Sequence, residues 1–158
     1  MCDRIEFAPE RNIDESAGKL VDRLIALTAS KPDDHVMVAG RRLLPAYLEL
    51  CARRYVHACC RTGLAPRIAD EPADTLWILN ATSEDELVAL ASNLGRDLRP
   101  NGTVAIAIGS SNSKGFPFRL RHLLLDSGFD AAHQRAVSIG GDVYLVARKN
   151  AGQRAKAA

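Results

Sequence analysis

The stretch 73–109, ADTLWILNATSEDELVALASNLGRDLRPNGTVAIAIG, decides the fold of this chain. It begins and ends with the apolar runs 75–79 and 103–108, each typical of a strand that is covered on both faces. Between them, Ser83 is followed three residues later by Glu86, which predicts a capping box at the start of a helix. Two strands joined by a helix of this length predict parallel pairing with a right-handed crossover. One face of the predicted helix carries apolar residues at helical spacing: Leu87, Leu90, Ala91, Leu94 and Leu98.

Two helices and two strands are predicted before this unit. The first helix is capped by Asn12 and runs to about Thr28, and the first strand covers 35–39 and ends at Gly40. A second helix begins near Pro45, and 55–60 is expected to form the second strand. The apolar residues expected on the buried face of the second helix are Leu44, Leu48, Cys51, Ala52 and Tyr55.

The segment between the second strand and Asp74 is too short for another full helix and strand. Residues 67–69 are predicted to form a brief edge strand, because prolines flank them. Downstream, 116–127 is expected to be a helix that ends at Gly128. The chain closes with two antiparallel strands, 134–139 and 142–147, joined at Gly140-Gly141.

Length and composition predict a single α/β domain over 1–149, with 150–158 as a flexible basic tail. The formal charge of +2 is too small to indicate a nucleic-acid partner, and no long apolar segment indicates a membrane. A soluble, cytoplasmic protein is expected. The four cysteines form no C-x-x-C pair and are expected to be reduced thiols, three of them buried in apolar stretches, so no metal site is predicted.

Three segments together carry a family resemblance. Asp74–Asn80, the LRPNGT turn at 98–103 and Gly128-Phe129 before a closing hairpin resemble the C-terminal half of class I S-adenosylmethionine-dependent methyltransferases. The resemblance implies a three-layer sandwich with sheet order 3-2-1-4-5-7-6, in which the third strand is short or absent here. It also implies a mostly parallel sheet with an antiparallel C-terminal hairpin, while the N-terminal helix is extra.

The N-terminal half departs from that family at the cofactor site. Family members end the first strand with an acid and a G-x-G pair, whereas this chain has Met37 and then Gly40-Arg41-Arg42. The second strand should end in an acid that takes the ribose hydroxyls, but it ends in Cys59-Cys60-Arg61. These departures predict a degenerate site with no cofactor and no catalytic residue. The chain is therefore expected to be a binding, regulatory or scaffold module rather than an enzyme.

Candidate pocket residues follow from the rule that ligands of open α/β sheets bind beyond the carboxyl ends of the strands. The first strand supplies Ala39, Gly40 and Arg41, and the fourth supplies Asn80 and Ala81. Asn80 also suits an ordinary approach to a capped helix. The resemblance adds a sixth candidate, because an acid after the third strand would hold the adenine amine: Asp70.

Two alternatives stay open. An active methyltransferase with an atypical cofactor loop would bind S-adenosylmethionine. A binder of an anion or nucleotide would use the Gly40–Arg42 loop, because arginines before a helix N-terminus favour phosphate or carboxylate. From Arg41 to Arg67 the chain has six arginines and one acid, Glu49, so a small anionic ligand or a protein partner is a further possibility.

Overall fold

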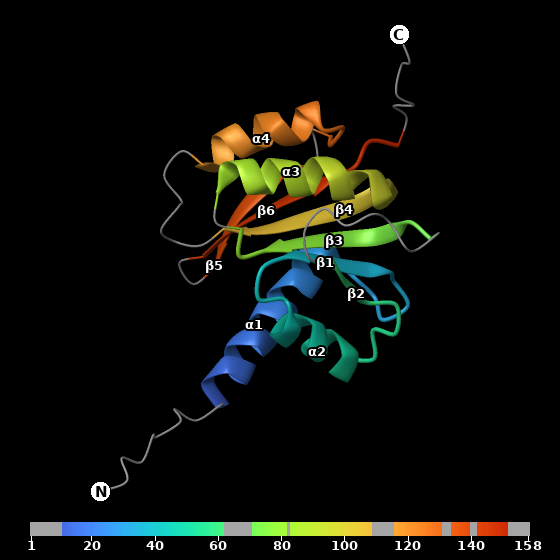
Figure 1. Ribbon diagram of the computed structural model, residues 1–158, viewed down its shortest axis with the longest axis vertical. Coiled ribbons are helices and arrows are strands. Elements are labelled where there is room, and N and C mark those ends of the chain that lie inside the picture. The colour runs from blue at the N-terminus through green and yellow to red at the C-terminus, as the bar shows by residue number, and fades with distance from the viewer. Residues whose placement is uncertain are drawn as a thin grey trace, which may run out of the picture.

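The computed structural model describes residues 11–61, 71–81, 83–108, 116–130, 134–139 and 142–151. A six-stranded sheet lies between two layers of helices (Figure 1). In chain order the elements are α1 (Arg11–Thr28), β1 (Val36–Gly40), α2 (Leu44–Ala52), β2 (Cys59–Arg61), β3 (Ala73–Leu79), α3 (Glu84–Leu94), the 3-10 turn η1 (Gly95–Asp97), β4 (Leu98–Ile108), α4 (Phe116–Asp126), β5 (Arg135–Ile139) and β6 (Asp142–Arg148).

The sheet has the order β2-β1-β3-β4-β6-β5. β1 pairs parallel with β2 and β3, and β3 pairs parallel with β4. β6 lies between β4 and β5 and is antiparallel to both. The predicted methyltransferase-like sandwich with its closing antiparallel pair is therefore confirmed. The proposed third strand at 67–69 lies outside the described residues.

The helices divide between the two faces of the sheet. α1 and α2 cover one face, and α3 and α4 cover the other (Figure 1). The buried side chains accordingly form two clusters, because alternate residues of each strand point to opposite faces. Trp77 lies in the cluster under α1 and α2, whereas Phe129 belongs to the cluster under α3 and α4.

The α3 unit forms as the sequence predicts. The Ser83 hydroxyl accepts a hydrogen bond from the Glu86 amide at 3.1 Å, and Ser83 has extended dihedral angles. The predicted apolar stripe is buried throughout. Its last member, Leu98, lies on β4 rather than on the helix, since α3 ends at Leu94.

The LRPNGT turn does not stand outside the sheet. It forms an irregular start to β4, where the pairing with β3 shifts between Ala73 and Thr75. The Asn101 amide donates to the carbonyl of Lys149 at 3.1 Å, and the Lys149 amide donates to that of Gly102 at 2.8 Å. These bonds replace the missing contacts with β3 and keep the turn in the sheet.

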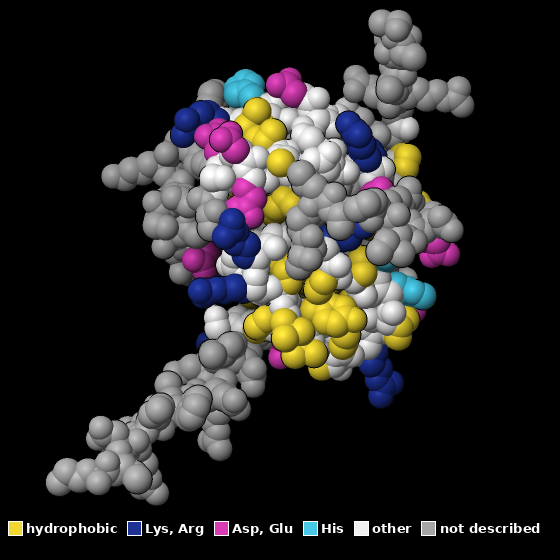
Figure 2. Space-filling model, viewed as in Figure 1, with side chains coloured by type: hydrophobic (Ala, Val, Ile, Leu, Met, Phe, Trp, Pro, Cys, Tyr) yellow, Lys and Arg dark blue, Asp and Glu magenta, His cyan; other side chains and the backbone are white. Residues whose placement is uncertain are grey.

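The prediction for the buried face of α2 is wrong for four of its five residues, and only Tyr55 is buried. Leu44 is 63% exposed and Leu48 55%, and Cys51 and Ala52 are exposed as well. The helix instead buries Ala46 and Leu50. Figure 2 shows a cluster of hydrophobic side chains on the surface over α2.

The second strand is shorter than predicted, because a helix C-terminal motif occupies its first residues. Arg54 has a φ of 66°, its amide donates to the Cys51 carbonyl, and the Tyr55 amide donates to that of Leu50. This is a Schellman motif with arginine at the position that glycine usually fills. Tyr55 is buried by it, and β2 begins only at Cys59.

The cysteines differ from their predicted burial. Cys51 and Cys60 are exposed, and Cys59 is half-buried. Desolvation raises the pKa of the Cys59 and Cys60 thiols. Across the described ranges, no group of three or more acids, histidines and cysteines could hold a metal ion.

Two observations concern the ends and the surface of the chain. The Asn150 amide donates to the Gly128 carbonyl at 3.0 Å, so the described chain stays attached beyond the predicted boundary at 149. Residues 152–158 lie outside the described part, and the basic tail stays a prediction. None of the helices in the described residues is long and apolar enough to cross a membrane.

Candidate functional site

The strand order reverses between β1 and β3, and the chain leaves these neighbouring strands toward opposite faces. α2 follows β1 on one face, while α3 follows β3 on the other (Figure 1). A crevice forms at such a point in α/β sheets, which is where their ligands usually bind. Gly40 ends β1 with a φ of 115°, and Asn80 follows β3 with a φ of 55°.

Gly40 permits a close approach between the two strands. A Cβ atom at this position would lie 1.9 Å from the carbonyl oxygen of Leu79, which no side chain could tolerate. The next amide, that of Arg41, donates to the same oxygen at 3.1 Å. The loop after β1 is thus held against the end of β3 by its main chain.

Two side chains add further links between the loops. The Asn80 amide group donates to the Arg41 carbonyl at 2.9 Å. The Arg41 side chain reaches Glu86 in the first turn of α3, with Nε 3.1 Å from Oε1. The Arg41 side chain is 61% exposed, so this ion pair is weak and can open.

The structure places four of the six predicted site residues together: Gly40, Arg41, Asn80 and Ala81. Ala39 is fully buried on the α3 side, so only its main chain could face a ligand. Ala81 is half-buried and packs on the same core cluster. The sixth candidate, Asp70, lies outside the described residues. Their role in ligand binding stays a prediction.

Sequence reasoning missed Glu86 as a member of this site, because the capping box already explained its presence. Its carboxylate also binds Arg41. One signal could have indicated the pair. Both residues lie just after neighbouring parallel strands, whose carboxyl ends meet at one edge.

Arg61 stands where the resembled family carries its ribose-binding acid, and it forms a second ion pair. Arg61 ends β2 beside Ala39, and its guanidinium lies 2.8 Å from the carboxylate of Asp97 in η1. The two side chains are only 15% and 17% exposed. Arg61 therefore ties β2 to the turn after α3, an arrangement that the sequence did not indicate.

No protein-family model and no curated protein matches the sequence, whereas solved structures match it closely in fold. Magnesium protoporphyrin IX methyltransferase from Synechocystis PCC 6803, solved with bound S-adenosylhomocysteine, aligns with a TM-score of 0.59 at 14% identity over 92% of this chain and 89% of its own. The fold is that of the S-adenosylmethionine-dependent methyltransferases.

Two further methyltransferase structures show the same likeness. A SAM-bound amino pentose methyltransferase from Micromonospora echinaspora aligns with a TM-score of 0.58 at 11% identity. The alignment covers 95% of this chain and 100% of that protein. An O-methyltransferase family protein from Burkholderia thailandensis aligns at 0.55 and 10% identity over 91% of this chain, which spans 60% of that protein. At these identities the likeness concerns the fold alone.

The prediction that no cofactor is to be expected is contradicted by these comparisons. Three of the matched methyltransferases hold S-adenosylmethionine or S-adenosylhomocysteine. The acids that are missing after β1 and β2 therefore do not exclude a cofactor. The close approach of β1 to the end of β3 requires a glycine at position 40, and that glycine is present.

Proposed function

We propose that this chain binds S-adenosylmethionine or S-adenosylhomocysteine across the carboxyl ends of β1 and β3, as the cofactor domain of a methyltransferase. The observation that carries this proposal is the close approach of Gly40 to Leu79 at the point where the strand order reverses. Matched methyltransferases of the same fold hold this cofactor. S-adenosylmethionine, when bound, supplies a methyl group on a sulfonium, which a nucleophile can accept, and S-adenosylhomocysteine remains.

The residues present fit one side of such a ligand better than the other. On the β1–β3 side, Gly40 keeps the end of β1 free of a side chain and Ala81 offers main-chain atoms, whereas the Asn80 amide group already donates to the Arg41 carbonyl. On the β2 side, the ribose would meet Arg61, whose guanidinium is engaged with Asp97. Binding is therefore proposed to be weaker than with an acid after β2.

Calorimetric titration with S-adenosylmethionine tests the proposal. Micromolar affinity corresponds to about 8 kcal/mol, and losing one hydrogen bond to a charged group costs about 1.5 to 3 kcal/mol. We therefore expect saturable binding with a dissociation constant of roughly 10 to 100 µM. An absence of saturation at several millimolar would remove the proposal.

The Arg41–Glu86 ion pair provides a second prediction, because it spans the loops between which the cofactor would lie. Arg41→Gln removes the pair, which as a surface contact is worth at most about 1 kcal/mol, so we expect binding to tighten by up to about fivefold. Arg42→Gln is the matched control, since Arg42 is exposed and no described side chain pairs with it. We expect this control to bind as the unaltered chain does.

The opposite result from Arg41→Gln would favour a different ligand. If the substitution weakens binding, Arg41 itself contacts the ligand, and the anion or nucleotide binder using Gly40–Arg42 becomes the better proposal. Titration with inorganic phosphate then distinguishes the two. Phosphate should compete with S-adenosylmethionine only in the second case.

A binding or regulatory role is a second candidate, and one observation favours it. Leu44, Leu48 and Val56 expose large apolar side chains on or beside α2, where Val56 reaches 75%. Patches of this kind often mark contacts between proteins. This role does not exclude cofactor binding at the other site.

A further inference from the structure

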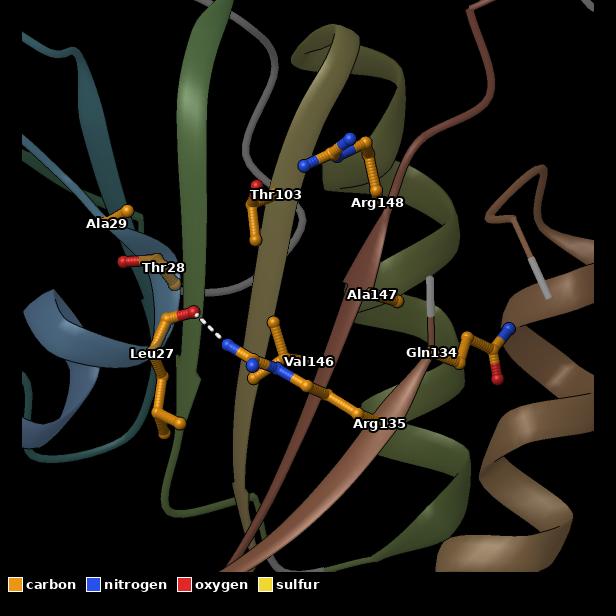
Figure 3. A pocket seen from close by; sticks show the side chains of 9 residues that line it. All are labelled: Leu27, Thr28, Ala29, Thr103, Gln134, Arg135, Val146, Ala147 and Arg148. Carbon is orange, nitrogen blue, oxygen red and sulfur yellow. Dashed lines mark hydrogen bonds between the residues drawn. The ribbon is translucent and has the colours of Figure 1, made fainter. Parts of the chain in front are cut away.

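A pocket of about 400 Å³ lies near the amino ends of the parallel strands, whereas the proposed cofactor site lies at their carboxyl ends. It opens beside the carboxyl end of α1, where the parallel strands begin and β6 ends (Figure 3). Its volume is within the range of small-molecule sites. The residues that line it are Leu27, Thr28, Ala29, Thr103, Gln134, Arg135, Val146, Ala147 and Arg148.

Strand register places three polar side chains on the same face of the sheet. Thr103 pairs with Arg148, and Arg135 pairs with Val146, which lies two residues before Arg148. Residues two apart on a strand share a face, so Arg135 and Arg148 are diagonal neighbours at about 7 to 8 Å. Both face the layer that holds α1.

The two guanidinium groups extend in the same direction. Figure 3 shows the Arg135 side chain crossing β4 to Leu27 at the end of α1, while the Arg148 side chain extends toward Thr103 on β4. Arg135 donates to the carbonyl oxygen of Leu27 at 2.9 Å and thereby caps the last turn of α1. Gln134 points the other way and donates to the Arg121 carbonyl of α4.

Both arginines of this pocket are exposed to solvent. None of its nine described lining residues is an acid. Within the described ranges, no side chain forms a hydrogen bond or an ion pair with Arg148. The positive charges of Arg135 and Arg148 repel each other, because the two residues are neighbours on the sheet. The carbonyl group at the end of α1 accepts a hydrogen bond from Arg135 only.

We propose that this pocket binds a small anion, the phosphate or carboxylate group of a metabolite. Arg148 holds it with its planar fork of donors, Arg135 contributes the donors that the Leu27 carbonyl leaves free, and the Thr103 hydroxyl donates from β4. The site is separate from the cofactor edge, and its test does not depend on cofactor binding.

Titration of the whole chain with inorganic phosphate and, separately, succinate tests the proposal. Amide NMR spectra are recorded at constant ionic strength, with sodium chloride replaced by each probe. We expect saturable shifts at Thr103, Arg135 and Arg148, with millimolar affinity. The tighter of the two probes identifies the phosphate or the carboxylate as the group that is bound.

Three variants make the test specific. Arg148→Gln and Thr103→Val should weaken binding, the arginine change by about tenfold or more. Arg96→Gln is the matched control, because Arg96 is an exposed arginine in η1 outside the pocket lining. Equal losses in Arg148→Gln and Arg96→Gln would overturn the proposal, as would shifts that rise without saturation or that centre on Gly40 and Asn80.

Discussion

Gly40→Ala is expected to lower the free energy of unfolding by roughly 2 to 6 kcal/mol, since overpacking and a left-handed φ each cost about 1 to 3 kcal/mol. The added Cβ would lie 1.9 Å from the Leu79 oxygen, and its neighbour on the other strand is main chain rather than a flexible side chain. The φ of 115° is also unfavourable for any residue with a Cβ. Urea unfolding followed by circular dichroism measures the loss.

Two other glycines separate these causes. Gly128 has a φ of 90° and nothing within 4 Å of an added Cβ, so Gly128→Ala should cost only the backbone strain, about 1 to 2 kcal/mol. Gly18 lies inside α1 with its nearest contacts at 3.8 Å, so Gly18→Ala should stabilise by about 0.5 to 1 kcal/mol. Equal effects at Gly40 and Gly128 would show that the contact with Leu79 is not tight.

The central unit could be predicted from sequence because several local signals agree there. The strand β3, the cap at Ser83 and the burial of the stripe from Leu87 to Leu98 were confirmed, although the helix itself ends at Leu94. The start of β4 differed, since Asn101 and Gly102 are turn formers by local propensity. Their hydrogen bonds to Lys149, far along the chain, keep them in the sheet.

The α2 region could not be predicted in the same way, because its apolar residues are compatible with two helix faces. Leu44, Leu48 and Cys51 fit helical spacing, but so do Leu43, Ala46 and Leu50, which are the ones that are buried. Periodicity alone does not choose between overlapping stripes. The start of the strand after α2 was predicted too early for a related reason. The helix ends in a left-handed residue, and this residue is Arg54 rather than the glycine that would have indicated such a cap.

The candidate site shows what a motif can and cannot predict. The position of Gly40 and Asn80 at one edge follows from parallel topology, which the sequence indicates. The ion pairs of Arg41 with Glu86 and of Arg61 with Asp97 join residues more than thirty positions apart. Such contacts depend on tertiary packing. The sequence therefore shows only an unassigned basic stretch from Arg41 to Arg67. In the described part of this stretch, three arginines have acidic partners: Arg41, Arg53 and Arg61.

Trp77→Ala is expected to cost about 3 to 5 kcal/mol, the range for removing a large aromatic side chain from a core. Trp77 is fully buried at the centre of β3, between Val38 of β1 and Ala105 of β4, which are also fully buried. A loss of this size approaches the whole stability of many domains. Chemical unfolding, followed by circular dichroism, gives the value if the variant still folds.

Trp77→Phe keeps the test informative if the alanine variant does not fold. The indole Nε1 is buried without a hydrogen-bond partner among the described residues, and an unsatisfied buried donor costs about 1 to 3 kcal/mol. Phenylalanine removes that donor along with some volume, so we expect the two effects to offset to within about 1.5 kcal/mol. Trp77 is the single tryptophan of the chain, and its fluorescence in the unaltered protein should lie at short wavelength. Emission typical of water-exposed indole, together with a near-neutral Trp77→Ala, would remove β3 from the centre of the sheet.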